Sequence, residues 1–543
     1  MKILWLDINS SFSHSSLAIP SLDAQLPSHI REQHNWNIVS GTINKNISHF
    51  VSEIISIQPD IILSTAWLFN HSILQAVLKR VYSIDNSIKI VLGGPEFLGD
   101  NRDYLVSNRH IYAVFKGDGE EIFPEFIQNL DNPKKWLELS GFCYIKDGDY
   151  IDSKAYNTKD FNNIKFPETS KLFNWKRPFV QIETSRGCFN SCAFCISGIP
   201  KGVQNLDIDQ IEERINRCIQ NGIKEIRILD RTFNANRSRA EQLLSLFYQY
   251  REHLNFHLEV HPALIDNRLK DSINKFKGDH LHIEAGIQSL DQNVIDLCTR
   301  IGTVEESLCG LNYMINQANL IVHTDLIAGL PGYTLERLFN DTISLIELNP
   351  DEIQLELLKL LPGTKFKEDA LSFGIKYSPE PPYEVLQTDS MSYSHLQISS
   401  SLSEIIDMFY NHSMWKDVFR SIIINNREAL NKIVDFYISR FERKIENREK
   451  RGLFLYDFCL ENEYSQVLDV IQLWNISGLS LKMGPGLLLN GWNPKTDLNN
   501  PIFIENKAQI KYRYLDYKNK RIWYAYDIII NNSKPIREFI EIL

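Results

Sequence analysis

The chain has 543 residues, of which 43% are hydrophobic and 23% are charged, so it has the composition of a soluble globular protein with several domains. Its formal net charge of −10 argues against a nucleic-acid partner held by a basic surface. No apolar run approaches the roughly eighteen residues that a membrane span needs. The N-terminal MKILWLDINS lacks the apolar core of a signal peptide.

The first 130 residues predict a doubly wound, Rossmann-like α/β sheet. Buried parallel strands are expected at 2–8, 60–67, 89–94 and 111–117, and residues 71–84 have helical periodicity. Such sheets bind ligands beyond the carboxyl ends of their strands. The residues predicted there are Asn9, Ser11, His14, Thr65, Trp67, Asn70, Gly93, Gly94, Glu96, Gly117, Gly119 and Glu120. The glycines either let a bulky ligand approach the backbone or simply make tight turns.

A second α/β series is predicted further along the chain. Residues 131–178 are polar and turn-rich, which indicates a connector with one hairpin turn at K-D-G-D. Residues 179–375 predict a partial (β/α)6 barrel, whose loops after the strands carry the chemistry. Its strands are expected at 179–184, 225–230, 256–261, 281–287, 321–328 and 352–358. Residues 376–543 predict a mixed α+β domain that caps the barrel and selects the substrate.

Three of the eight cysteines lie in one short loop after the first barrel strand, E-T-S-R-G-C-F-N-S-C-A-F-C. They are Cys188, Cys192 and Cys195; the other five are isolated, as in proteins of the reducing cytoplasm. Structural zinc sites and [4Fe–4S] clusters both normally take four protein ligands. Three thiolates on a cluster would leave one iron open to a small molecule, which suits catalysis. A plain redox or zinc role is the alternative.

The C-x3-C-x2-C spacing in this position resembles the signature of the radical S-adenosylmethionine (SAM) enzymes. The resemblance implies a [4Fe–4S] cluster on the three cysteines, whose open iron binds SAM and whose electron cleaves SAM to a 5′-deoxyadenosyl radical. It also implies an electron donor such as flavodoxin or ferredoxin. The residues that it implies for SAM binding are Phe194, Asp230, Glu259, Gln288, Arg300, Ala328 and Leu330.

The resemblance gives these residues separate roles. Phe194 occupies the place of an aromatic ring beside the adenine, and Glu259 could bind the ribose hydroxyls. Asp230 lies where the methionine amino group is usually held, although the usual Gly-Gly-Glu-type motif is absent. The segments G-I-Q-S (286–289) and D-L-I-A-G-L-P-G (325–332) resemble stretches around SAM. Glu259 and Arg300 could instead form a salt bridge inside the barrel.

A doubly wound domain before a radical SAM barrel resembles the cobalamin-binding subgroup of these enzymes. The segments G-G-P-E (93–96) and K-G-D-G-E-E-I-F (116–123) look like its strand-end loops. L-K-L-L-P-G-T (358–364) and P-P-Y-E-V-L-Q-T (381–388) look like a little-characterised branch with its own C-terminal extension. The D-x-H-x-x-G motif is absent, so cobalamin is expected to bind base-off, without a histidine lower ligand. Trp67 or Asn70 could face its lower side, or Trp67 could be a core residue.

The usual chemistry of this subgroup is methylation of an unreactive carbon, with methylcobalamin and the 5′-deoxyadenosyl radical. The resemblance therefore implies a C-methyltransferase acting on a peptide or a small molecule. A ring-forming or rearranging cobalamin enzyme, and a binding protein without turnover, are alternatives. A methylthiolase of RNA or a ribosomal protein is disfavoured because it would need three more N-terminal cysteines, and only Cys143 precedes Cys188.

Overall fold

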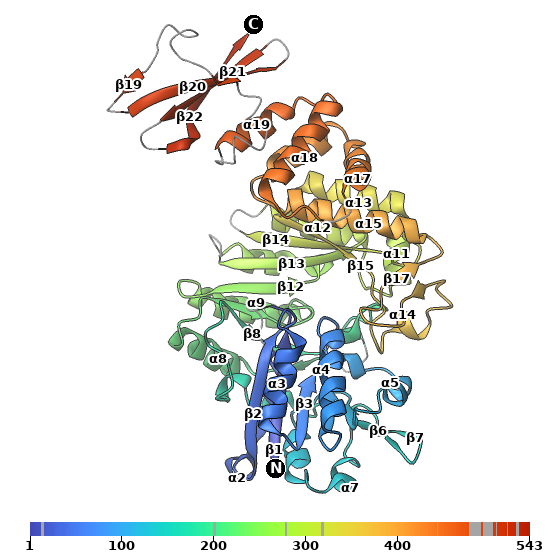
Figure 1. The fold of residues 1–543 in the computed structure, drawn as a ribbon. Helices are drawn as coiled ribbons and strands as arrows, with labels where there is room; N and C mark the ends of the chain where they lie inside the picture. The colour runs from blue at the N-terminus through green and yellow to red at the C-terminus, as the bar shows by residue number, and fades with distance from the viewer. Residues whose placement is uncertain are drawn as a thin grey trace. The chain divides into compact units, whose positions relative to one another are not determined.

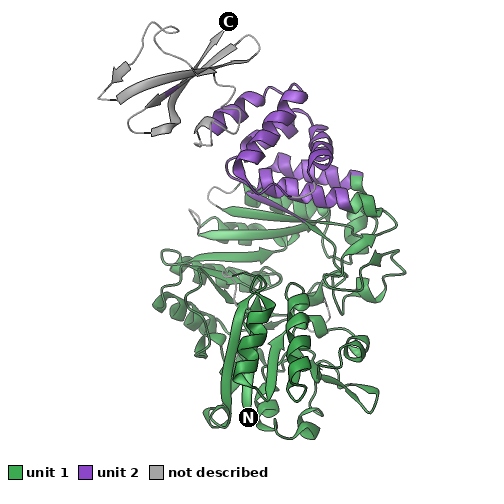
Figure 2. Cartoon of the chain, viewed as in Figure 1, with its two compact units in different colours: residues 1–335, 356–396 green, residues 336–355, 397–543 purple. Residues whose placement is uncertain are grey.

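The computed structural model describes residues 1–11, 16–198, 202–276, 280–316, 320–441, 444–476, 490–491, 503–505, 508–517, 520–527 and 531–542. The chain forms two compact units, one of residues 1–335 with 356–396 and one of residues 336–355 with 397–543 (Figure 2). Over the described residues, no helix combines the length and the apolar character needed to cross a membrane.

The N-terminal sheet has the strand order β2-β1-β3-β4-β5-β6-β7. Its strands β1, β2, β3, β6 and β7 are labelled in Figure 1. Its strands are β1 (Lys2–Asn9), β2 (Asn35–Thr42), β3 (Ile61–Thr65), β4 (Lys89–Gly93), β5 (Ala113–Phe115), β6 (Phe142–Lys146) and β7 (Asp149–Asp152). The first five are parallel, and β6 and β7 add an antiparallel hairpin. The strand order reverses between β1 and β3, which is where open sheets of this kind form their ligand-binding crevice.

Strand β1 explains why helices cover both faces of this sheet. Its side chains alternate between the faces, and five of its eight residues are apolar. Leu4, Leu6 and Ile8 join the core of α3 (Ile47–Ile57) and α4 (His71–Ile84). Ile3 and Trp5 join the core of α1 (Ala18–Gln25) and α6 (Phe123–Gln128). The predicted doubly wound fold is confirmed.

Two features of the sheet differ from the sequence prediction. Strand β2 is not among the predicted strands because it lies at the sheet edge, and only its Val39 is buried. The predicted turn at K-D-G-D does form, with positive φ at Asp147 and Gly148. Its two strands, however, extend the N-terminal sheet, so this part of the connector belongs to the sheet.

The second sheet has the order β15-β14-β13-β12-β11-β8. Its strands are β8 (Val180–Ile182), β11 (Glu225–Ile228), β12 (Asn255–Val260), β13 (Leu281–Gln288), β14 (Ile321–Ala328) and β15 (Glu352–Leu357). The strands from β8 to β14 are parallel, and the intervening helices include α8 (Ile208–Gln220), α9 (Arg237–Tyr250) and α12 (Val304–Ile315). Spatial order follows chain order, as in a partial (β/α)6 barrel, so this prediction is also confirmed.

The C-terminal region has a helical part and a strand part, as predicted. The helices are α15 (Tyr393–Ile405), a π-helix (Ile406–Tyr410), α16 (Lys416–Asn425), α17 (Ala429–Arg440), α18 (Arg448–Glu461) and α19 (Val467–Ile476). Aromatic rings fill their core, and Phe409 stacks on Phe419 and Phe454 with centroids 5.9 and 5.3 Å apart. The described strands β20 (Ala508–Tyr517), β21 (Lys520–Asp527) and β22 (Asn531–Ile542) pair antiparallel.

Candidate functional site

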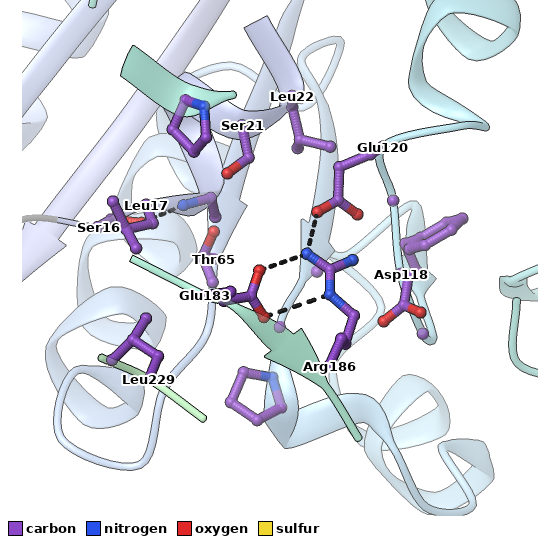
Figure 3. Close-up of a pocket in the computed structure, with 18 of the residues that line it drawn as sticks. Ser16, Leu17, Ser21, Leu22, Thr65, Asp118, Glu120, Glu183, Arg186 and Leu229 are labelled. Atoms are coloured by element: carbon purple, nitrogen blue, oxygen red, sulfur yellow. Dashed lines mark hydrogen bonds and ion pairs between the residues drawn. The ribbon is translucent and has the colours of Figure 1, made fainter. Parts of the chain in front are cut away.

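A cavity of about 780 Å³ lies between the carboxyl edge of the N-terminal sheet and the first strands of the barrel. Its wall on the sheet side includes the predicted residues Asn9, Thr65, Trp67, Gly93, Gly94, Gly117, Gly119 and Glu120. Its wall on the barrel side includes Gln181, Ser185, Arg231 and Glu259. Glu183 and Arg186 of the same wall are shown in Figure 3. One hollow is therefore faced by both α/β series.

The glycines at this edge serve two different purposes. Gly94 and Gly117 have φ values of 111° and 108°, and a Cβ on them would lie 2.5 Å from the Ala66 oxygen and 2.0 Å from the Tyr156 oxygen. These two positions need glycine because the backbone turns and packs tightly there. A Cβ on Gly93 would meet its nearest atom at 3.9 Å. Gly93 therefore leaves open room in the cavity.

One part of the cavity is aromatic and contains an unused hydrogen-bond donor. Its rings come from Trp5, Phe115, Phe123, Phe126, Phe142 and Phe161. Trp5 is only 4% exposed, and among the described residues nothing accepts a hydrogen bond from its Nε1. Buried indole N–H groups usually have a partner. The cavity thus offers a ligand apolar surface, and a buried, unpaired N–H belongs to one of its lining residues.

Trp67 and Asn70, the two predicted lower-face candidates, lie in different environments. Trp67 is on the cavity wall, 36% exposed and stacked on Phe69, so it is not a core residue. Asn70 is 1% exposed, and its amide donates to the carbonyls of Ile8 and Thr65 at 2.9 and 3.0 Å. Asn70 therefore ties the ends of β1 and β3 together and does not line the cavity.

Two other predicted residues of the sheet edge, Glu96 and Ser11, are not among the described residues that line the cavity. Glu96 is buried and accepts a hydrogen bond from the Tyr383 hydroxyl at 2.9 Å, and burial raises the pKa of this carboxyl. It therefore anchors the segment after the barrel to the G-G-P-E loop. Ser11 does not line the cavity, and His14 lies outside the described residues.

The cysteine loop is closed at its base by a short ladder. Strand β9 (Ser185–Arg186) pairs antiparallel with β10 (Gln204–Asn205), so all three cysteines lie between two joined ends. Gly187 has a φ of 93°, and a Cβ there would lie 2.1 Å from the Gly202 oxygen. Only glycine fits where the two arms of the loop meet.

The donor set of the loop fits an iron–sulfur cluster. Cys192 is buried, which raises the pKa of its thiol, while Arg300, with Nη1 3.8 Å from Sγ, opposes that shift. Cys188 and Cys195 are partly exposed and close enough to interact electrostatically with Cys192. Within the described ranges, no three Cys, His, Asp or Glu side chains converge to hold a single metal ion. A cluster does not need such convergence because each thiolate binds its own iron.

Asp230 supports the start of this loop. Its Oδ1 accepts hydrogen bonds from the backbone N–H groups of Thr184 and Ser185 at 2.7 and 2.9 Å, and its Oδ2 from their hydroxyls at 2.5 and 2.7 Å. Burial raises the pKa of this carboxyl, and the hydrogen bonds oppose the shift. All these partners are protein groups, so the structure gives Asp230 a positioning contact instead of an open carboxylate for the SAM amino group.

The other residues predicted to bind SAM are distributed around the strand ends. Arg300 Nη2 donates to the Gly286 carbonyl at 2.9 Å, and Arg231, not Arg300, is the main cation acting on Glu259. Burial raises the pKa of Glu259, which lies on the cavity wall. Gln288, with a φ of 69°, ends β13. Ala328 and Leu330 are fully buried, and Phe194 is partly buried.

The inner face of the barrel is polar. Along β12, β13 and β14, one set of alternate residues is buried and, apart from Thr324, apolar. The other set contains His257, His282, Glu284, His323 and Asp325. His257 Nε2 lies 2.9 Å from Glu284 Oε1. The centroid of the His282 ring lies 4.1 Å from that of the His257 ring and 4.4 Å from that of the His323 ring. Closed barrels usually fill this space with branched aliphatic residues. This face can instead contact a polar molecule.

The charges on this face influence one another. Although burial opposes it, the His257 ring, 2.9 Å away, and the His323 ring, with Nδ1 3.7 Å from Oε1, hold the pKa of Glu284 well below its usual range. Burial, together with the nearby Glu284 carboxylate, raises the pKa of Asp325 to about 7. One carboxylate is thus fixed as an anion, and the other can hold or release a proton near neutral pH.

Sequence reasoning missed an ion-pair group on the cavity wall. Arg186 Nη2 lies 2.9 Å from Glu120 Oε1 and 2.6 Å from Glu183 Oε2, and Arg186 Nε lies 3.2 Å from Glu183 Oε1 (Figure 3). Glu183 and Arg186 belong to the cysteine motif, but sequence spacing alone does not reveal that Glu120 approaches them. Trp5 was not predicted to line the cavity either. Its place inside an apolar strand makes it look like an ordinary core residue in the sequence.

Both halves of this site match known families. Residues 8–127 match the B12 binding domain, and residues 182–341 match the radical SAM superfamily. The protein is a radical SAM enzyme with a B12-binding domain. Residues 371–483 of the enzyme also match a family described as a protein of unknown function (DUF4080), in agreement with the predicted C-terminal extension.

Three curated relatives cover different shares of the enzyme. An uncharacterized methyltransferase of Pyrococcus horikoshii is 24% identical over 415 residues, covering 73% of this chain and 89% of the relative. The tRNA-2-methylthio-N(6)-dimethylallyladenosine synthase of Buchnera aphidicola is 28% identical over 317 residues, covering 53% of this chain and 63% of the relative. The cobalamin-dependent radical SAM methyltransferase TokK of Streptomyces tokunonensis is 20% identical over 349 residues, covering 60% of this chain and 51% of the relative.

The fold of the enzyme is similar to that of a solved relative. The cobalamin-dependent S-adenosylmethionine radical enzyme OxsB, with aqua-cobalamin and S-adenosylmethionine bound, superposes with a TM-score of 0.61. The match covers 87% of this chain and 78% of OxsB, at 14% sequence identity. The likeness at this identity concerns the fold, including the order of the two α/β domains.

Proposed function

We propose that the enzyme transfers a methyl group from SAM to an unactivated carbon of a peptide or small molecule, with cobalamin and a [4Fe–4S] cluster as cofactors. The observation that carries this proposal is the single cavity faced by the sheet edge and by the base of the cysteine loop. Methyl transfer is supported by the methyltransferase names of the Pyrococcus and Streptomyces relatives. When bound, these cofactors supply methyl transfer and radical generation, and the protein supplies position and shelter from water.

The cavity residues fit cobalamin in the base-off form. Gly93 leaves room for a large flat ring, and Trp67 is the proposed neighbour of its lower face. The aromatic part of the cavity suits a planar base, because its rings offer flat apolar surface. The remaining proposed contacts are Asn9, Thr65, Gly94, Gly117, Gly119 and Glu120.

The cysteine loop and the strand ends fit the cluster and SAM. Cys188, Cys192 and Cys195 are the proposed cluster ligands, and the arginine beside Cys192 stabilises negative charge there. Glu259, whose carboxylate faces the cavity, is the proposed ribose contact. The other proposed SAM residues are Phe194, Gln288, Arg300, Ala328 and Leu330, with Asp230 acting through the loop that it holds.

The polar inner face of the barrel is the proposed substrate wall. Glu284 would hold a hydrogen-bond donor or a cation of the substrate, because His257 and His323 keep it ionised. Asp325 would accept or return a proton near neutral pH. A substrate on this wall would lie within the same compact unit as both proposed cofactor sites.

The cofactor content tests the first part of the proposal. Protein made anaerobically and reconstituted with iron, sulfide and hydroxocobalamin should contain about four irons and one base-off corrinoid per chain. C192A should lose iron, whereas C309A, which removes an exposed cysteine on α12, should keep it. Iron without corrinoid would remove the methyl carrier from the proposal, and zinc in place of iron would overturn the cluster assignment.

Product analysis tests the reaction itself. Reduced holoenzyme is incubated with SAM carrying a trideuterated methyl group and with fractionated small-molecule and peptide extracts. A substrate gaining one CD3 group, with formation of both S-adenosylhomocysteine and 5′-deoxyadenosine, would support the proposal. Substrate-dependent 5′-deoxyadenosine without label transfer would instead support the alternative, a ring-forming or rearranging enzyme. That alternative has support from OxsB, whose name specifies no methyl transfer.

A further inference from the structure

Arg186 lies at a junction of the two domains of the first unit. It is the last residue of β9, at the base of the cysteine loop and two positions before Cys188. Its guanidinium binds Glu183 of the same motif, and it also binds Glu120, which follows β5 of the N-terminal sheet (Figure 3). A single side chain therefore joins the rim of the cavity proposed to bind cobalamin, here called the corrinoid cavity, to the loop that carries the cysteines.

The backbone around Arg186 is fixed on both sides. Towards the cysteines, β9 pairs with β10, and Gly187 packs against the Gly202 carbonyl. On its other side, Asp230 accepts hydrogen bonds from both the backbone and the hydroxyl of Ser185. A movement of the Arg186 head group would therefore be passed to the base of the cysteine loop.

The loop that carries Glu120, residues 117–121, is fixed as well. The Asp118 N–H donates to the Tyr156 carbonyl at 2.8 Å, and the Tyr156 hydroxyl donates to Glu121 Oε2 at 2.7 Å. The Asp118 carboxylate accepts the Thr158 N–H at 2.9 Å. This loop also lines the cavity through Gly117 and Gly119. A ligand in the cavity would therefore contact the loop that carries Glu120.

Residues 156–161 of the connector reinforce the junction. The Thr158 hydroxyl accepts a hydrogen bond from Arg186 Nη1 at 3.3 Å, and the Phe161 ring lies under the guanidinium at 4.7 Å. The Thr158 carbonyl accepts a hydrogen bond from Gln204 of β10 at 2.7 Å. The connector thus contacts both the loop of residues 117–121 and the two arms of the cysteine loop, β9 and β10.

The chemistry of arginine suits this position. A guanidinium is planar and carries five N–H donors, so it can bind two carboxylates, a hydroxyl and a ring face at once. Removing it would leave Glu120 and Glu183, two partly buried carboxylates, facing each other without a cation. The two loops would then separate or take up water. A lysine provides the charge but cannot make the same set of directed bonds.

We infer that Arg186 is a positioning residue that couples the corrinoid cavity to the cysteine loop, so that corrinoid binding and SAM binding at the cluster strengthen each other. This inference rests on the proposed cofactors. Thermodynamic linkage requires the effect to be reciprocal: the factor by which SAM tightens corrinoid binding equals the factor by which corrinoid tightens SAM binding.

Equilibrium dialysis of the cluster-loaded enzyme, without reductant so that SAM stays intact, measures this factor. Hydroxocobalamin is titrated with and without saturating SAM, and SAM with and without saturating hydroxocobalamin. We expect each ligand to tighten the other by about fivefold or more. In R186M the factor should fall to near one, whatever the separate affinities are, and R186K should recover part of it. R217M is the control, because Arg217 forms an exposed ion pair with Glu213 on α8.

The possible results separate the inference from the proposed function. Wild-type coupling that survives in R186M would overturn the inference. Binding of both ligands without coupling in the wild type would overturn it too, and would leave the cofactor proposal standing. A wild-type protein that binds no corrinoid would instead overturn the cofactor proposal. If R186M fails to fold, E120Q provides the test, because it keeps the size of the side chain and removes its charge. The coupling factor must fall in E120Q, and an unchanged factor would reject the inference.

Discussion

Nη1 of Arg300 lies 3.8 Å from Sγ of Cys192, while Nη2 of the same guanidinium donates to the Gly286 carbonyl at 2.9 Å. One arginine therefore links the end of β13 to the buried cysteine of the proposed cluster. A cation and an N–H donor beside a cluster thiolate stabilise the more negative, reduced cluster. Arg300 would thus affect how readily the cluster accepts an electron.

R300M should assemble the cluster and give it a more negative midpoint potential, because the positive charge and the N–H···S contact are both lost. An anaerobic redox titration followed by electron paramagnetic resonance measures this potential. The midpoint potential of the cluster in R300K should lie between those in R300M and in the wild type. R237M is a control, since Arg237 is about half exposed and pairs with Asp266 away from the cysteines. A potential that is unchanged or more positive in R300M would contradict the assignment.

D230A should destabilise the first unit by about 2–4 kcal/mol, because two backbone N–H groups and two hydroxyls lose their buried acceptor. Urea unfolding followed by circular dichroism measures the loss. The variant should also take up less iron, since the start of the cysteine loop is no longer held. D271A, which removes an exposed carboxylate on α10 (Asn267–Ile273), should change neither property. Wild-type stability in D230A would show that the four contacts are dispensable.

Asp325 should make stability depend on pH. In the folded protein this carboxyl keeps its proton up to about pH 7, whereas in an unfolded chain it loses the proton at about pH 4. Between these values the native state binds more protons than the unfolded state, so the stability contributed here falls as the pH rises. D325N removes the titrating group. Relative to the wild type, its unfolding free energy should therefore rise by about 1–3 kcal/mol between pH 5 and pH 8.

Unfolding of wild type and D325N at several pH values tests this expectation, with D271N as an exposed control. A difference between D325N and the wild type that stays constant from pH 5 to pH 8 would mean that Asp325 is already ionised throughout the range. A difference that moves in the opposite direction would mean that ionised Asp325 stabilises the native barrel.

G93L should weaken hydroxocobalamin binding by at least tenfold, because the new side chain extends into the space that the cavity leaves beside Gly93. Equilibrium dialysis measures the affinity, and thermal unfolding of the apoprotein reports whether the fold is kept. S40L adds the same side chain at an exposed position of β2 and should bind normally. Wild-type affinity in a folded G93L protein would exclude Gly93 from the corrinoid site.

The sequence predicts well the elements whose signal is local. Buried strands such as β1 and β3 contain short continuous apolar runs, and the helix expected at 71–84 is α4 with the same bounds. Strand β2 gives no such signal because it lies at an edge and is largely solvated. The C-x3-C-x2-C motif identifies the cysteine loop because its ligands are close in the sequence. The partners of Arg186 and Asp230 are not local, and no spacing rule reveals them.

By itself, the sequence determines two α/β series, the order in which they occur, and the three thiols that a cluster would use. These follow from periodicity and spacing, which act over a few residues. Only the tertiary structure decides that Glu120 meets Arg186 across 66 positions of the chain, and that Asn70 and Glu96 serve as anchors away from the cavity. It also decides that the buried Trp5 N–H finds no acceptor among the described residues. Such contacts depend on how sheets and helices pack, because packing brings together side chains whose separation in the sequence carries no information about their distance in space.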